Sequence, residues 1–259
     1  MQKEIFVYVH VPKCFGTSFL DSIRSNDINE NPKISENLVW FDMFHRYYAR
    51  MYPSTSYDSP PNSDIEVTCF KDIILPLFLK SKKQKLLVHF HADTLNLDKI
   101  IPKEVRRTYI LTIRNGADRL GSAYNYRLFQ AQNDRGKNRP DWASSFFFEN
   151  HGYYNGPERL VPRLFGYIDN CHIPYHHLEK IIILNLKDYT NKGHVTKYLE
   201  QQIGIDIEPC HANSKTICFS PPNKSDKTFW DRINKKIEIE NKYWRYLLNY
   251  CYNNSFLNY

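Results

Sequence analysis

Residues 7–23 read VYVHVPKCFGTSFLDSI and pass from a strand pattern through a polar loop into a helix pattern. The run from Ile5 to Val11 alternates and is rich in β-branched residues, which predicts a buried strand. The run from Thr17 to Ser25 has its apolar side chains at helical spacing. In open α/β sheets, loops that join a strand to a helix in this way lie at the edge where ligands bind. The loop PKCFGTS is therefore the first candidate for a site.

The rest of the chain repeats this alternation of apolar strands and amphipathic helices. Further strands are predicted at Lys85 to Phe90, Thr108 to Ile113 and Lys180 to Leu186. Helices are predicted at Ala117 to Gln132, Pro157 to Ile168, Asp188 to Ile203 and Lys227 to Tyr252, with a weaker helical pattern around Phe41 to Met51. We expect one α/β domain over residues 1–259, with a central parallel sheet flanked by helices and a surface insertion around residues 27–64.

The charge balance favours an anionic ligand or acceptor. The formal net charge is +7, with 35 lysines and arginines. These are scattered along the chain, with short clusters at Lys80 to Lys85 and Arg135 to Arg139, whereas a nucleic-acid footprint concentrates on one face. We therefore expect no nucleic-acid partner.

The six cysteines form no CxxC pair, which favours free thiols in a reducing compartment. No run approaches the roughly 18 apolar residues of a membrane span, and the strand pattern begins by Ile5, before a leader could fit. The sequence predicts a cytoplasmic protein with no integral membrane span, and leaves its oligomeric state open.

The loop PKCFGTS has the residue types that bind phosphate. Free amides at a helix start attract anions, and Gly16 lets the backbone approach closely. Lys13 adds a mobile positive charge, and the hydroxyls of Thr17 and Ser18 can cap the helix and bind phosphate oxygens. No lysine precedes the hydroxyl pair, so this is not the GxxxxGK[ST] loop of nucleotide triphosphatases. An ordinary capped turn remains the alternative.

A second strand, loop and helix follow at residues 108–126, TYILTIRNGADRLGSAYNY. Arg114 stands at the predicted strand end and Ser122 follows eight residues later. If the helix begins near Gly116, then Arg119, Ser122 and Tyr126 share one face. An arginine at a strand tip and a serine on the adjoining helix can hold one phosphate from two sides. Two such sites on one sheet suggest a ligand with two phosphorylated ends.

These two motifs resemble those of sulfotransferases that use 3′-phosphoadenosine-5′-phosphosulfate (PAPS), of the carbohydrate branch that includes heparan sulfate 2-O-sulfotransferases. PKCFGTS is similar to that family's PK-x-G-GTS loop, with Cys14 and Phe15 as departures, and Arg114 to Tyr124 resembles R-[DN]-P-x-x-R-x-x-S-x-Y, with Gly116 instead of proline. The resemblance implies a P-loop-containing nucleotide-hydrolase-like fold, PAPS as the donor and adenosine 3′,5′-bisphosphate as the product. It implies that the 5′-phosphosulfate is held by Lys13, Cys14, Phe15, Gly16, Thr17 and Ser18, and the 3′-phosphate by Arg114, Arg119 and Ser122.

Sulfuryl transfer needs a base for the acceptor hydroxyl, and two histidines are placed for it. His89 and His91 lie on one face at the end of the predicted strand at 85–90, and imidazole accepts protons near neutral pH. By the resemblance His91 is the base and His89 the reserve, while Lys13 compensates the charge on the leaving phosphate oxygen. Structural histidines, or a metal-binding pair, are the alternatives, and we expect no metal.

The remaining expectations concern the acceptor and the rival functions. Lys215 and Thr216, in HANSKT, match loosely a loop that closes over the nucleotide in the resembling enzymes, and an exposed linker fits equally well. Aromatics beside cations at residues 27–64 and 133–156 suit a hydroxyl-bearing glycan or glycoconjugate, or equally the packing of these loops. A small-molecule or nucleotide kinase and a non-catalytic nucleotide-binding module are the alternative functions.

Overall fold

The computed structural model describes residues 2–9, 14–24, 38–42, 68, 70–90, 100–120, 122, 180–209 and 227–253. These residues form a five-stranded sheet in the order β2-β3-β1-β4-β5, and every pair of neighbouring strands is parallel. The strands are β1 (Glu4–Val9), β2 (Leu38–Asp42), β3 (Lys85–Phe90), β4 (Arg106–Ile113) and β5 (Lys180–Asn185). The predicted α/β class with a central parallel sheet is confirmed.

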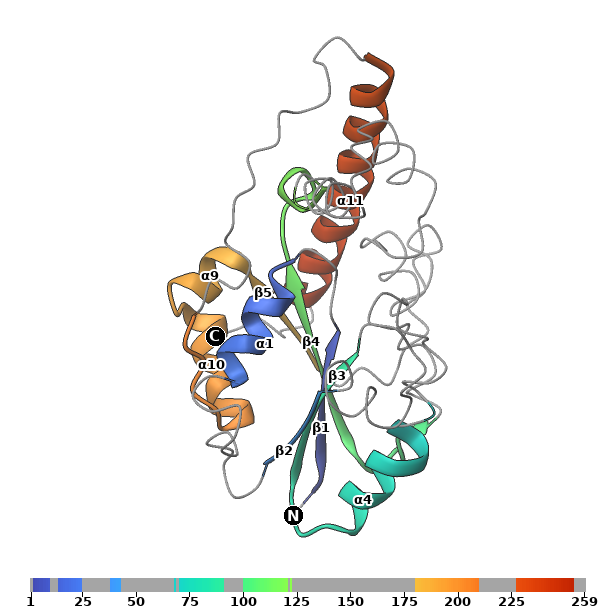
Figure 1. The fold of residues 1–259 in the computed structure, drawn as a ribbon, viewed down its shortest axis with the longest axis vertical. Helices are drawn as coiled ribbons and strands as arrows, with labels where there is room; N and C mark the ends of the chain where they lie inside the picture. Colours follow the sequence, from blue (N-terminus) through green and yellow to red (C-terminus); the bar gives the residue numbers. More distant parts are fainter. Residues whose placement is uncertain are drawn as a thin grey trace, which may run out of the picture.

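Helices cover both faces of the sheet (Figure 1). One face packs on α1 (Gly16–Arg24), α9 (Leu186–Thr190) and α10 (His194–Ile203) through a core that includes Phe19, Tyr189 and Leu199. The other face packs on the π-helical turn η2 (Phe70–Ile74) and on α4 (Leu75–Lys80). The long helix α11 (Lys227–Asn253) contributes Trp244 to this second core. The strands β1, β3, β4 and β5 contribute buried side chains to both cores, as expected for parallel strands covered by helices on both faces.

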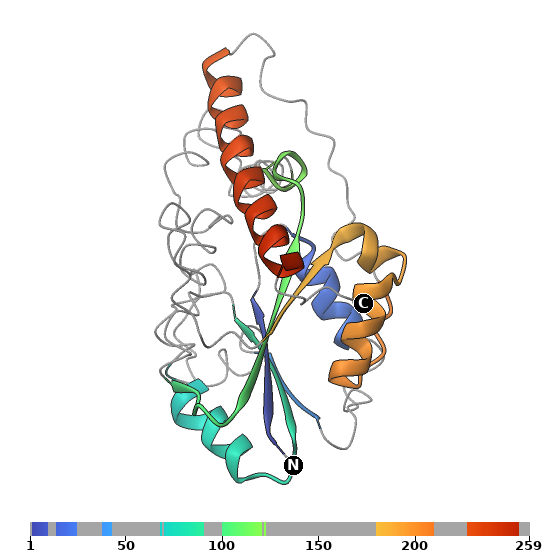
Figure 2. The same ribbon diagram turned by 180° about the vertical axis from the view of Figure 1, so that it is seen from behind.

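The strand carboxyl ends lie at the end of the sheet where α11 crosses, and Figure 2 shows this arrangement from behind. The chain enters α1 from β1 at this edge and enters a helical segment at residues 116–120 from β4. The edge where sequence reasoning placed the site is therefore the one that α11 covers.

Two expectations about secondary structure were wrong. Residues 38–42 form the edge strand β2, which pairs with β3, so this part of the expected surface insertion belongs to the sheet. The helix expected around Phe41 to Met51 would begin inside this strand. The single helix expected over Asp188 to Ile203 is two helices, α9 and α10, separated by a turn at residues 191–193. The rest of the expected insertion and the helix at Pro157 to Ile168 lie outside the described residues.

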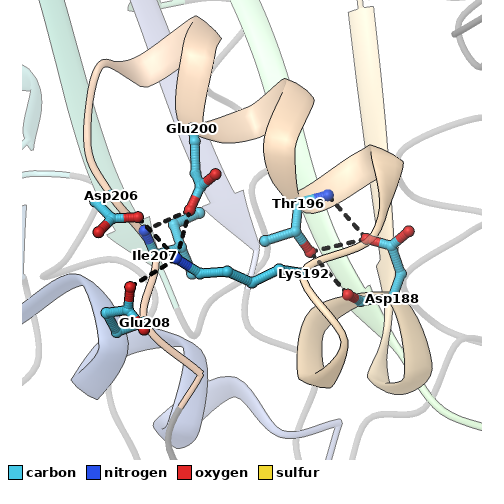
Figure 3. Close-up of polar contacts among 7 residues, drawn as sticks. All are labelled: Asp188, Lys192, Thr196, Glu200, Asp206, Ile207 and Glu208. Carbon is cyan, nitrogen blue, oxygen red and sulfur yellow. Dashed lines mark hydrogen bonds and ion pairs between the residues drawn. The ribbon is translucent and has the colours of Figure 1, made fainter.

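The turn between α9 and α10 is held by side chains (Figure 3). Lys192 has a φ of 47°, in the left-handed region that ends helices, and its Nζ donates to Asp206 at 2.9 Å and Glu208 at 2.7 Å. Asp188 accepts from the backbone amide of Thr196 at 2.8 Å and so caps the start of α10. Local polar contacts, rather than a change in hydrophobic pattern, therefore break the helix.

Candidate functional site

The two predicted anion-binding loops follow neighbouring strands. β1 and β4 pair in parallel with Val9 beside Leu111, so their carboxyl ends share one edge. Beyond these ends, Arg114 lies close enough to Cys14 that its backbone amide and, through space, its guanidinium both act to lower the pKa of the Cys14 thiol. The start of α1 and the segment that follows β4 are therefore close neighbours.

Cys14 is a core residue at this contact. Its side chain is fully buried, and burial raises the pKa of the thiol to about 12. The neighbouring Arg119 guanidinium acts in the opposite direction and lowers this pKa, but burial dominates. The thiol is therefore neutral at physiological pH, and only the backbone of Cys14 remains available for the ligand contact predicted from sequence.

Phe15 occupies the cap position of α1. Its carbonyl accepts the first helical hydrogen bond, from the Phe19 amide at 3.0 Å. Its φ is 51°, a left-handed conformation that phenylalanine rarely adopts. Stacking holds it there, because its ring lies 5.2 Å from the ring of Tyr189 at an interplanar angle of 25°.

A phenylalanine at the cap position gives the first amides of α1 no capping side chain. The first amides of a helix have no intrahelical acceptor, and a phenyl ring cannot accept from them as a serine or aspartate cap would. Among the described residues the amides of Gly16 and Thr17 have no acceptor, and Thr17 is exposed. The capping expected of Thr17 and Ser18 was wrong, since both lie inside the helix.

Ser18 faces the interior rather than solvent. The residue is only 8% exposed, and its carbonyl accepts a hydrogen bond from the Tyr189 hydroxyl at 2.9 Å. This contact ties α1 to α9, on the same ring that supports Phe15. Thr17 is therefore the better placed of the two predicted hydroxyls for an external ligand.

Arg114 lies one residue beyond β4 and lines a pocket of about 800 Å³. The walls come from the end of β4 and the segment after it, from the end of β5, from α9 and from α11. The charged lining residues are the cations Arg114, Lys187 and Arg245 and the carboxylates Asp118 and Glu238. The Nε atom of Arg114 is buried and has no hydrogen-bond partner among the residues that the structure describes. A buried guanidinium donor without an acceptor favours an anionic ligand at this place.

The segment after Arg114 begins a helix as the sequence indicated. Asn115 caps it, because its side-chain oxygen accepts from the Asp118 amide at 2.9 Å and its carbonyl accepts from the Arg119 amide at 3.0 Å. Ser122 is half-buried on the same segment. That Arg114 and Ser122 hold one phosphate together stays a prediction.

Arg119 does not take the role expected for it. Its side chain is fully buried, and its Nε donates to Glu240 of α11 at 2.7 Å while Nη2 forms a second contact with the same carboxylate. A guanidinium with this bidentate partner has its main donors occupied. The structure therefore makes Arg119 an internal tie to α11 rather than a phosphate ligand.

His89 is also a core residue. Its ring is fully buried and stacks on Tyr8 at 5.4 Å, and Tyr8 in turn contacts Phe19 of α1. A base must reach the acceptor hydroxyl, so this position argues against His89 in that role. The preferred base, His91, lies outside the described residues together with Lys13, Lys215 and Thr216, and the roles expected for these four stay predictions.

Sequence reasoning missed the contribution of α11 and of the β5 end. Asn241, Trp244 and Arg245 of α11 line the same pocket as Arg114, and so does Lys187 of α9. The sequence contained one signal of this contribution. Ile233 and Trp244 are buried and lie on one face of α11, and the charged residue Glu240 falls on the same face at helical spacing. A carboxylate inside an apolar stripe needs a buried partner.

Comparisons with protein-family models, with curated proteins and with solved structures give no match to this chain. Within the described ranges, no helix combines the length and the apolar character needed to cross a membrane. The same residues contain no group of three or more histidine, cysteine or acidic side chains that could hold a metal ion.

Proposed function

We propose that the protein is a sulfotransferase that moves a sulfuryl group from PAPS to a hydroxyl acceptor. The observation that carries this proposal is the proximity of the two loops, since Arg114 lies close enough to Cys14 to act on the pKa of its thiol at the shared edge of β1 and β4. A ligand with two anionic ends needs two anion-binding elements within the length of one nucleotide. The proximity of Arg114 to Cys14, two residues before the start of α1, supports such an arrangement.

Each element has a role in the proposed site. The uncapped amides of Gly16 and Thr17, with the exposed Thr17 hydroxyl, bind the 5′-phosphosulfate. Arg114 binds the 3′-phosphate through its guanidinium, which presents a fork of donors that fits phosphate. The nucleoside lies in the pocket beside Arg114, whose volume falls within the range of about 300 to 1,000 Å³ usual for small-molecule sites.

The proposed chemistry is a direct transfer. The acceptor oxygen attacks sulfur and forms a new S–O bond, while the bond between sulfur and the 5′-phosphate oxygen breaks and its electrons stay on that oxygen. His91 takes the proton of the acceptor hydroxyl, and Lys13 compensates the negative charge on the departing oxygen. The net charge of +7 favours the approach of the anionic donor. The acceptor class that we propose is a glycan or glycoconjugate hydroxyl.

A thermal-shift comparison tests this proposal. Adenosine 3′,5′-bisphosphate without metal should raise the melting temperature, since a ligand at 100 times its Kd stabilises the folded state by about 2.7 kcal/mol. ATP with Mg²⁺ at the same concentration should have a much smaller effect. Stabilisation by ATP and Mg²⁺ alone would instead identify a kinase. Binding of the bisphosphate, with no labelled sulfate transferred from PAPS to a panel of glycan acceptors, would identify a non-catalytic module.

A further inference from the structure

Helix α11 makes an unusually close contact with the segment after β4. The amide of Gly116 donates to the Asn241 side-chain oxygen at 3.0 Å. A β-carbon on Gly116 would lie 3.1 Å from the carbonyl oxygen of Ile237 and 3.3 Å from the Cβ of Glu240. Backbone therefore meets backbone here, which explains why this chain has glycine where the resembling signature has proline. Proline would lack the amide that Asn241 accepts from.

One turn further along, the Arg119–Glu240 pair repeats this connection. Both side chains are fully buried, and the pair joins residues 121 positions apart in the sequence. Burying two charges costs free energy that their attraction only partly returns, so such a pair is weak support for stability. Its best-attested use is to fix one arrangement of the elements that it joins.

The elements joined here are the wall of the pocket and the loop that carries Arg114. Asn241 and Trp244 line the pocket from α11, and Arg114 lies two residues before Gly116. The Nε of Arg114 has no acceptor among the described residues, so that donor does nothing to hold the guanidinium in place. Its position therefore depends on the backbone on either side: β4, which the sheet holds, and the segment after it, which α11 holds at Gly116 and Arg119.

We propose that Glu240 is a positioning residue of the nucleotide site. By pairing with Arg119 it holds the loop of Arg114 against α11, so that Arg114 reaches the 3′-phosphate. It also occupies the guanidinium of Arg119, which leaves Arg114 as the cation of this segment for the ligand. This inference rests on the proposed function and adds to it a residue far along the chain that touches no part of the donor.

The test compares two nucleotides in matched variants by isothermal titration calorimetry. Adenosine 3′,5′-bisphosphate requires Arg114 in its place, whereas adenosine 5′-monophosphate lacks the group that Arg114 binds. Glu240→Gln should weaken binding of the bisphosphate about tenfold to hundredfold, the usual loss for a misplaced binding group, and leave the Kd of the monophosphate nearly unchanged. A merely structural role would weaken both ligands together, and that result overturns the proposal.

Two further variants control the experiment. Glu4→Gln makes the same chemical change at the amino end of β1, where the carboxylate accepts from Thr108 at 2.9 Å, and should leave both Kd values as in the wild type. Arg119→Met combined with Glu240→Leu removes both buried charges, which commonly preserves the fold. This double variant should still lose the preference for the bisphosphate over the monophosphate. If it keeps the preference of the wild type, the proposal is overturned. This test remains valid even if Glu240→Gln fails to fold. A wild-type protein without that preference would contradict the proposed function itself.

Discussion

Because Phe15 has a left-handed backbone conformation, we predict that the protein with glycine at this position is more stable than the protein with alanine, the reverse of the usual order. Both substitutions lose the stacking on Tyr189, so their difference isolates the backbone. At a φ of 51°, a residue with a β-carbon pays about 1–2 kcal/mol relative to glycine. Glycine loses about 0.4–1 kcal/mol through the greater freedom of its unfolded chain. Phe15→Gly should therefore be more stable than Phe15→Ala by about 1 kcal/mol, the balance of these two terms.

Equilibrium unfolding in urea, monitored by circular dichroism, measures this difference. The matched control is the same pair of substitutions at Lys235, an exposed position inside α11. There the glycine variant should be less stable than the alanine variant by about 1 kcal/mol. The reasoning is refuted if Phe15→Ala is at least as stable as Phe15→Gly while the two Lys235 variants keep the ordinary order. That result would mean that the start of α1 lacks the backbone geometry on which the proposed phosphate contacts depend.

Three further predictions concern packing, reactivity and pH. Gly116→Ala should lower the free energy of unfolding by about 1–3 kcal/mol in urea titrations, because its β-carbon meets the α11 backbone, and an unchanged midpoint would contradict this close contact. Cys14, whose pKa is raised to about 12 by burial, should resist iodoacetamide at pH 8 in the folded protein and react in urea, as read by peptide mass spectrometry. Hydrogen bonds to Glu208 and Asp206 raise the pKa of Lys192, and the bond from Lys192 lowers that of Asp206. The melting-temperature loss of Lys192→Gln should therefore be largest between the ordinary pKa values of 3.8 and 10.5 and shrink at either extreme; a loss that grows below pH 3.8 would exclude the ion pairs as its cause.

The sheet could be predicted where its strands are buried on both faces. The strand at Lys85 to Phe90 has the expected bounds, and those of β4 and β5 differ from the expected ones by two residues or fewer. Helix α11 extends one residue beyond the predicted end. In each case the apolar pattern alone reflects the packing, because these elements bury continuous runs or a regular stripe.

The edge of the sheet was harder to predict. The strand β2, LVWFD, is short and lies in a polar and aromatic stretch, so its pattern does not distinguish a strand from the start of a helix. The break between α9 and α10 depends on the contacts of Asp188 and Lys192 with residues that become neighbours only after folding. Hydrophobic periodicity contains no information about such contacts.

The position of the two candidate loops could be predicted, but not the surroundings of their side chains. Both loops were expected at the carboxyl ends of parallel strands, and β1 and β4 are neighbours in the sheet; that these loops bind anions stays a prediction. The pairing of Arg119, which argues against its expected role, could not be predicted because its partner, Glu240, is 121 positions away and no local spacing connects them. The amide of Gly116 likewise takes its meaning from a helix at the other end of the chain.

The central claim is that the start of α1 and Arg114 bind opposite ends of one nucleotide. The most direct test measures the Kd of adenosine 3′,5′-bisphosphate and of adenosine 5′-monophosphate in the wild type and in Arg114→Met. We predict that the 3′-phosphate strengthens binding in the wild type, by about 1.5–3 kcal/mol for a charge-assisted contact, and that Arg114→Met abolishes this gain while the monophosphate still binds. An equal preference for the bisphosphate in both proteins would contradict the account.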